Sequence, residues 1–232
     1  MGTTPGRKGR FPGYDVVAQA ANWDPETAGV VLARLDAPGP LRFFNPDEAL
    51  TAEALLDRLL AQSDEPKVPL VQMVDARLAD GIIDGYRYED MPSDADAWHQ
   101  SLAAIEALSQ DQHGRGFHTV AEGEQNDLLE RVRGADRLGS LPAKRVFGLW
   151  MRYGCAAFYS HPWAWNEIGY GGPAYPRGYK NLGLGRREPW EVVEARSPDP
   201  GPWAERLTAA RQRHAGGGPA SSSDPAATSR GA

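Results

Sequence analysis

Residues 146–181 read VFGLWMRYGCAAFYSHPWAWNEIGYGGPAYPRGYKN and hold three of the chain's seven Trp and five of its eight Tyr. The first half predicts a helix, because apolar and aromatic side chains between Val146 and Phe158 recur at steps of three and four and so share one face. Pro162 is expected to end this helix, since proline has no backbone N–H and disfavours helical backbone in the residue before it. An amphipathic helix therefore leads directly into a different kind of segment.

Residues 162–181 contain Gly and Pro too often for a regular helix or strand, which predicts an irregular loop. A loop this rich in Trp and Tyr must bury them against its own fold or against a partner. One interpretation is that Trp163 and Trp165 fold back on Trp150 and Phe158 as a local cap. The other makes the loop the main interface with a partner protein, with its glycines permitting close backbone approach.

The residues assigned to partner binding on the second interpretation are His161, Trp163, Trp165, Asn166, Tyr170, Gly171, Gly172, Tyr175 and Arg177. Arg177 is expected to pair with a partner carboxylate, because a guanidinium group can donate two parallel hydrogen bonds. His161 has a plainer interpretation as the last residue of the helix, stabilised by the negative end of the helix dipole. A catalytic role for His161 lacks a nucleophile or a paired carboxylate nearby in the sequence.

Upstream, apolar periodicity and cap residues predict further helices. Asn45 is the expected N-cap of a helix that runs to about Gln62, and Asp24 is the expected N-cap of a short helix over 25–35. Thr119 has Glu three residues later, which is the pattern of a capping box. The remaining expected helices cover 69–79, begin at a cap formed by Asp94, and open at Leu141 or Pro142.

No segment shows the period-two alternation of a strand, so the predicted fold class is all-α. We expect an irregular bundle of about five main helices, a long aromatic- and glycine-rich C-terminal loop, and a disordered tail. The expected divisions are an N-terminal arm at 1–40, a helical domain at 41–196 and a tail at 197–232. The arm carries aromatic side chains and should pack on the domain. A short helix around 203–214 is compatible with the sequence, and the Gly- and Ser-rich end after it cannot bury a core.

The chain of 232 residues has a net charge of −6 and 41% hydrophobic residues, enough for one sizeable core. Its acidic balance argues against non-specific nucleic-acid binding. A single cysteine, Cys155, excludes an internal disulfide framework, and no apolar run is long enough for a transmembrane helix. The N-terminal residues show neither an apolar leader nor an adjacent arginine pair. The expected location is the cytoplasm, or the periplasm after export on a signal-bearing partner.

Few residues indicate chemistry in this chain. Gly183 and Gly185 begin like a dinucleotide fingerprint, but Glu188 stands in place of the third glycine. His113 and His118 lie five residues apart across two glycines, which is not a helical metal-ligand spacing. Motifs of phosphate loops, covalent haem attachment and nucleophile elbows are missing. The sequence therefore predicts no catalytic, cofactor-binding or metal-binding residue.

Two polar features receive structural interpretations only. Asp75 and Arg77 are expected to be solvated or paired at the surface of their helix. The segment 81–92 is expected to be a polar, Tyr-containing connection between two helices.

Four segments in a fixed order resemble the gluconate 2-dehydrogenase subunit 3 family. They are FNPDEALTAEALLDRLL at 44–60, VPLVQMVDARLADG at 68–81, FHTVAEGEQNDLLERV at 117–132 and FYSHPWAWNEIGYGGPAYPRGY at 158–179. The resemblance covers about 45–181 and rests on the order of these segments and on the last loop. Many members of that family carry a twin-arginine leader, which this chain does not show.

The resemblance implies a small subunit with no redox centre of its own. It implies a large FAD-bearing partner of the glucose–methanol–choline oxidoreductase type, acting on sugars or related alcohols, which the small subunit stabilises or matures. FAD is then expected in the partner subunit and no cofactor in this chain. An electron-acceptor protein is a further candidate partner, whereas nucleic acid and membrane insertion are not implied.

Two other classes of function stay open at this point. In one, the chain is a free-standing carbohydrate-binding protein whose Trp and Tyr rings stack on sugars. In the other, it is a structural helical domain whose aromatic loop packs on its own bundle.

Overall fold

The computed structural model describes residues 11–36, 38–63, 66–181 and 186–193, together with the isolated positions Thr208 and Gln212. These four ranges belong to one compact unit, residues 1–195, and residues 196–232 form a second unit. The glycines at 183 and 185 lie outside the described residues. So do the expectations for the tail, apart from the two isolated positions.

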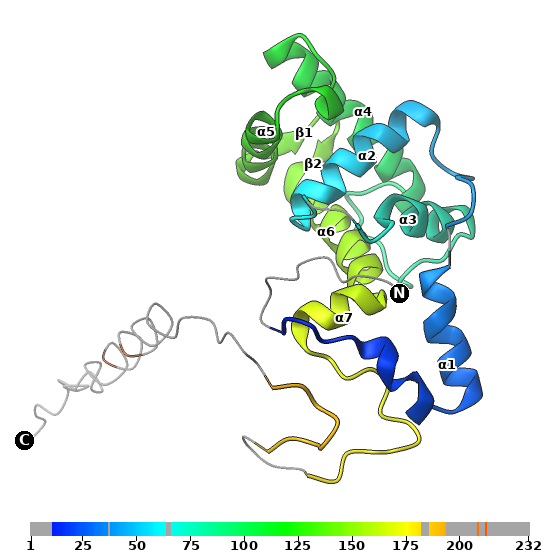
Figure 1. Cartoon of the computed structure of the whole chain (residues 1–232). Helices are drawn as coiled ribbons and strands as arrows, with labels where there is room; N and C mark the ends of the chain where they lie inside the picture. Colours follow the sequence, from blue (N-terminus) through cyan, green and yellow to red (C-terminus); the bar gives the residue numbers. More distant parts are fainter. Residues whose placement is uncertain are drawn as a thin grey trace, which may run out of the picture. The chain divides into compact units, whose positions relative to one another are not determined.

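Five helices build the main body, which confirms the all-α class (Figure 1). They are α2 (Pro46–Leu59), α3 (Leu70–Ala79), α4 (Asp94–His113), α5 (Glu122–Gly134) and α6 (Ala143–Ser160). A short 3-10 turn, η3 (Phe117–Thr119), separates α4 from α5. In the described ranges, no helix is both long and apolar enough to cross a membrane.

A pair of two-residue strands precedes α6. β1 (Arg137–Leu138) and β2 (Leu141–Pro142) are antiparallel, with Leu138 opposite Leu141. Gly139 in the connecting turn has a positive φ of 56°. Strands this short leave no alternating pattern in the sequence, which is why none was expected.

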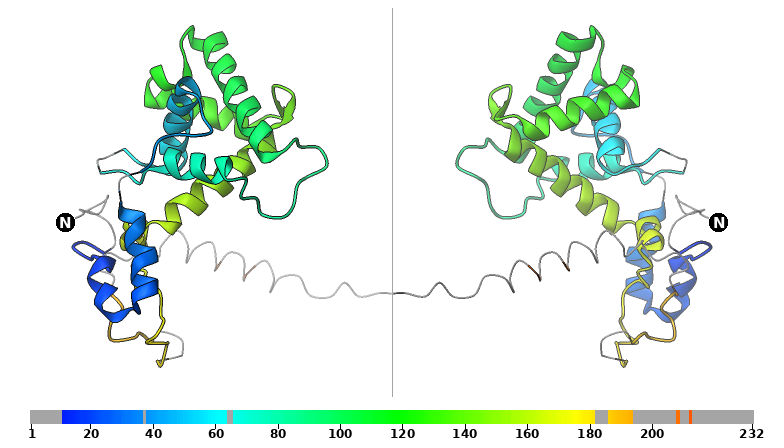
Figure 2. Two further views of the ribbon diagram at one scale, coloured as in Figure 1. Left: turned by 90° about the vertical axis from the view of Figure 1, so that its right-hand side faces the viewer. Right: turned by 90° about the vertical axis from the view of Figure 1, so that its left-hand side faces the viewer.

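The N-terminal arm and α7 lie together at one end of α6, away from α5 (Figures 1 and 2). The arm consists of the 3-10 helix η1 (Val16–Asn22), α1 (Pro25–Leu32) and the 3-10 turn η2 (Ala33–Leu35). The other helix at this end, α7 (Pro162–Ile168), was not expected. Pro162 ends α6 but also begins α7, because the missing proline N–H is not needed in the first turn of a helix.

Helix α6 is at the centre of the packing, since it contacts α2, α3, α4, α5, α7 and both strands. The predicted stripe of α6 is buried, with Trp150 fully enclosed and Tyr153 1% exposed. The Trp150 indole donates a hydrogen bond of 2.9 Å to the hydroxyl of Ser101 on α4. The largest enclosed side chains around this stripe are Trp98, Phe117, Leu55, Leu56, Leu102, Ile105 and Leu128.

Two of the predicted helix caps are confirmed and two are wrong. Asn45 and Glu48 exchange hydrogen bonds in a capping box, and the Asp24 carboxylate accepts from the backbone of Thr27. At α4 the N-cap is Ser93 and not the predicted Asp94. Thr119 does not cap α5, because its hydroxyl donates to the carbonyl of Gly116 and closes the η3 turn.

Asp75 was expected at the surface of its helix, but it is only 1% exposed. Its carboxylate accepts three backbone hydrogen bonds, from Arg42 at 2.7 Å, Phe43 at 2.9 Å and Phe44 at 2.8 Å. These N–H groups belong to the chain that enters α2. The Asp75 side chain thus fixes the entry to α2 by supplying acceptors that no secondary structure provides there.

We predict that Asp75→Ala lowers the free energy of unfolding by on the order of 3 kcal/mol, because it leaves the buried N–H of Phe44 and the partly buried N–H groups of Arg42 and Phe43 without their acceptor. Denaturant unfolding followed by circular dichroism measures this loss. Asp127→Ala on the exposed face of α5 is the control and should change stability by less than about 0.5 kcal/mol. Equal effects of the two substitutions would contradict the assigned role.

Candidate partner-binding surface

His161 is the residue that joins α6 to α7. Its backbone is extended, with φ −89° and ψ 136°, and its Nδ1 accepts a hydrogen bond of 3.2 Å from the backbone N–H of Trp163. The side chain is 2% exposed. The pKa of His161 is lowered to about 4, mainly because the side chain is buried. A hydrogen bond with the backbone of Arg34 raises this pKa, and the nearby positive charge of Arg34 lowers it. His161 is therefore a neutral N-cap of α7 and not a cation at the end of α6.

Trp165 and Asn166 of α7 hold the N-terminal arm. Trp165 is 6% exposed and packs with Val16, Trp23 and Val31 of the arm, while its indole N–H donates to the carbonyl of Tyr159 at 2.6 Å. The Asn166 side-chain oxygen accepts from the backbone N–H of Val16 at 2.7 Å. Neither side chain is presented to a partner in this conformation.

Trp163 packs on the other side of α7. It is partly buried against the core of the main bundle and lies edge-on to the His161 ring, with centroids 4.8 Å apart. Trp163 therefore packs on the bundle, as the local-cap interpretation predicted, whereas Trp165 packs on the N-terminal arm.

The glycines of the loop permit close approach to aromatic rings of the same chain. A Cβ added to Gly171 would lie 2.4 Å from the Trp190 ring, and one added to Gly172 would lie 2.3 Å from the Trp23 ring. Gly172 also has a φ of +76°, which disfavours other residues. Close approach was expected, but its partners are the arm and residues 186–193.

Arg177 is also engaged within the chain. Its guanidinium donates to the side chain of Gln19 at 2.9 Å and to the carbonyls of Gly171 and Pro173, each at 3.3 Å. It stacks over the Trp190 ring with its central carbon 3.9 Å from the centroid. The residue therefore ties the arm, the loop and residues 186–193 together.

The exposed aromatic side chains at this end of the molecule are tyrosines. Of the residues predicted to bind a partner, Tyr175 is 68% exposed and Tyr170 is 39% exposed. Tyr159, Ile168 and Tyr179 add exposed apolar surface from neighbouring parts of α6, α7 and the loop. We refer to these five residues as the tyrosine surface.

A second exposed apolar segment was missed in the sequence. The connection between α3 and α4 projects from the helical body (Figure 2), and it exposes Ile82, Ile83, Tyr86 and Tyr88 by 54%, 63%, 53% and 44%. Its description as polar overlooked two adjacent isoleucines, which are an unusual choice for a solvated turn.

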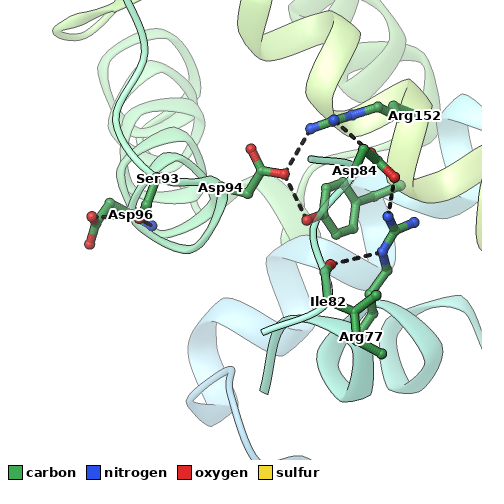
Figure 3. Close-up of polar contacts among 8 residues, drawn as sticks. Arg77, Ile82, Asp84, Ser93, Asp94, Asp96 and Arg152 are labelled. Atoms are coloured by element: carbon green, nitrogen blue, oxygen red, sulfur yellow. Dashed lines mark hydrogen bonds and ion pairs between the residues drawn. The ribbon is translucent and has the colours of Figure 1, made fainter. Parts of the chain in front are cut away.

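Polar contacts hold the start and the end of this connection (Figure 3). Asp84 accepts from Arg77 on α3 at 2.5 Å and from Arg152 on α6 at 2.6 Å. Asp94 accepts from Arg152 and from the Tyr153 hydroxyl, both at 2.8 Å. Burial and the hydrogen bond to this carboxylate raise the pKa of Tyr153. Arg77 is thus paired near the surface as expected, and it also stacks on the Tyr153 ring at 4.6 Å.

Comparison with known proteins identifies a family. A family model described as Gluconate 2-dehydrogenase subunit 3 matches residues 46–172, from the first residue of α2 to the glycine pair after α7. No curated protein and no solved structure matches the chain. Within the described ranges, no three His, Cys, Asp or Glu side chains are grouped so that they could hold a metal ion.

We predict that stability falls as the pH is lowered from about 6.5 to about 4, partly through His161. The unfolded chain binds a proton on this histidine in that interval and the folded chain does not, so protonation favours unfolding. With allowance for solvent screening the effect is on the order of 2 kcal/mol. His161→Asn keeps a cap acceptor and removes the titration. Its unfolding free energy, measured by denaturant titration at both pH values, should fall less than that of the parent chain.

We predict that Trp165→Ala detaches the N-terminal arm while the bundle stays folded, because Trp165 supplies the ring on which the arm packs. The loss of a buried Trp costs on the order of 3 kcal/mol. Limited proteolysis with mass spectrometry should show early cleavage within 11–35, and circular dichroism should show retained helix. Tyr175→Ala removes an exposed ring and should leave the cleavage pattern unchanged. An unchanged arm in Trp165→Ala would refute this assignment.

Proposed function

The chain belongs to the gluconate 2-dehydrogenase subunit 3 family, and on that premise we propose that it is the accessory small subunit of an FAD-dependent dehydrogenase. The observation that carries the proposal is the extent of the match, which covers the whole helical bundle and α7. The partner in this proposal is a large subunit of the glucose–methanol–choline oxidoreductase type that oxidises sugars or related alcohols. The small subunit stabilises or matures it and is not catalytic by itself.

The flavin in this proposal is bound by the large subunit. The sequence supports this division of labour, since Glu188 replaces the third glycine of the segment at 183–188 that begins like a dinucleotide fingerprint. The proposed location follows that of the partner: the cytoplasm, or the periplasm if the partner carries an export signal. An electron-acceptor protein is a further partner of the assembled complex.

The tyrosine surface is the proposed contact with the large subunit. Tyrosine is enriched in the centres of protein interfaces, because its ring gives apolar contact and its hydroxyl can still form a hydrogen bond. Tyr170 and Tyr175 are the proposed anchors. Trp165, Asn166 and His161 act from the interior by fixing α7, and Gly171 and Gly172 act by fixing the course of the loop.

A carbohydrate-binding function is less well supported. Sugar stacking needs open aromatic faces, and of the rings expected to supply them only those of Tyr170 and Tyr175 are exposed, while the two tryptophans are occupied. Trp165 is buried under the arm, and Trp163 is partly buried against the bundle.

We predict that the purified chain is colourless. Co-expression with its flavoprotein should yield a yellow complex that shows the absorption spectrum of bound flavin. The double variant Tyr170→Ala, Tyr175→Ala should remain folded and lose the flavoprotein during affinity purification. Two lost anchors of about 2 kcal/mol each weaken binding by roughly a thousandfold if they add.

Leu50→Ser is the matched control, since Leu50 is 45% exposed on α2. It should retain the flavoprotein at full yield. Flavin bound to the isolated chain would refute the accessory role, and full retention by the tyrosine variant would refute the assigned surface.

A further inference from the structure

A hollow of about 250 Å³ lies between the connection 81–92 and the start of α6. Tyr86 and Tyr88 line it from the connection, and Leu149 and Gly148 line it from α6. A second hollow of about 310 Å³ adjoins it, shares Tyr86, and extends to the exposed Ile83. We call these two neighbouring hollows together the Tyr86 groove.

The groove is positively charged although the chain as a whole is negative. Arg77 and Arg152 together are balanced by Asp84 and Asp94, and Arg145 lies 3.6 Å from Asp90. Two further lining cations, Arg87 and Lys144, are exposed and form no hydrogen bond or ion pair with any residue that the structure describes.

The nearby acids cancel these two charges only in part. Glu89 is the one acid of 81–92 left without an ion pair among the described residues, and it does not line either hollow. Lys144 lies in the first turn of α6, which contains no acid, so the positive end of the helix dipole adds to its field. An acidic ligand would relieve this concentration of positive charge.

Gly148 keeps the floor of the groove open. It lies inside α6, where glycine destabilises a helix relative to alanine, and a Cβ at this position would meet nothing within 4 Å. By contrast, a Cβ at Gly154 of the same helix would lie 3.0 Å from Leu56, so packing within the chain accounts for that glycine. No contact in the described structure requires the glycine at 148, and the space beside it is open, as it also is at Gly123 of α5.

The aromatic walls are held in place before any ligand binds. Arg145 stacks on the Tyr88 ring at 3.6 Å, and Tyr86 lies edge-on to Tyr88 with centroids 5.8 Å apart. Asp84, two residues before Tyr86, is clamped by arginines from α3 and α6 (Figure 3). A surface fixed in this way loses little conformational entropy on binding.

We propose that the Tyr86 groove binds an acidic, extended segment of a partner polypeptide. An apolar side chain of that segment fills the hollow above Gly148, and its carboxylates pair with Arg87 and Lys144. The presence of two neighbouring hollows and the exposed Ile82 and Ile83 beside them suit a polypeptide, because a small anion would leave the apolar walls unused. The inference rests on the proposed function for the existence of a partner, and it assigns a contact separate from the tyrosine surface.

The test uses the full chain and a fluorescein-labelled peptide in which glutamates flank a central phenylalanine, measured by fluorescence anisotropy. Gly148→Leu should fill the hollow and weaken binding about tenfold or more, while its melting temperature stays the same or rises. Gly123→Leu is the matched control, because Gly123 is an exposed helical glycine of α5 with equal space around it. It should leave the affinity unchanged.

A charge test completes the design. Arg87→Glu with Lys144→Glu should weaken binding about tenfold or more, and higher salt should weaken binding to the parent chain. Arg131→Glu with Arg133→Glu on α5 makes the same change in net charge and should have an effect of less than about twofold. Equal losses in the two double variants would overturn the proposal by showing a general charge effect.

Other occupants give different results. Displacement of the peptide by inorganic phosphate at matched ionic strength would indicate a small-anion site and overturn the proposal. Self-association of the chain that Gly148→Leu abolishes would indicate a second copy and overturn it too. Absence of peptide binding would also overturn it. Because the peptide replaces the large subunit, these outcomes are independent of whether a flavoprotein partner is found.

Discussion

Burial of the aromatic stripe of α6 is the interaction on which the other features of the structure depend. Trp150 and Tyr153 sit where four other helices of the bundle meet α6, and their polar atoms are satisfied by Ser101 and Asp94 of α4. The same helix also contributes to both proposed contact surfaces. Its first turns form one side of the Tyr86 groove, and its last residue leads through His161 into α7. Both proposed contact surfaces therefore take their positions from one buried helix.

The aromatic residues after α6 divide into a structural set and an exposed set. The tryptophans face inward in two directions, toward the bundle and toward the arm, and their burial gives the short helix α7 its stability. An isolated helix of this length would not persist in water. The tyrosines keep their rings at the surface, where a ring with a hydroxyl is tolerated without a large solvation cost.

The N-terminal arm packs on α7 but lies outside the region that the family model matches. The matched region contains Trp165 and Asn166, but Val16, Trp23 and Val31, which cover or bind them, lie before its first residue. The arm contributes apolar side chains and one backbone N–H to α7. In this chain, the end of the family domain is therefore covered by a segment of the same polypeptide.

The sequence by itself determined where the main helices lie and which face of each is buried. Periodic apolar residues fixed the stripe of α6, and local cap chemistry fixed the starts at Asn45 and Asp24, because these signals act within a few residues. Local signals misjudged Pro162, which serves equally well to end one helix and to begin another.

Tertiary structure decided what each polar and aromatic side chain does. Asp75 looks like a surface acid on α3, but the chain entering α2 brings three N–H groups to it across more than thirty residues of sequence. Trp165 looks like an exposed anchor until the arm packs over it, and His161 loses its affinity for a proton only when it is buried. Exposure and pKa depend on neighbours that are distant in sequence, so no local pattern could have given them.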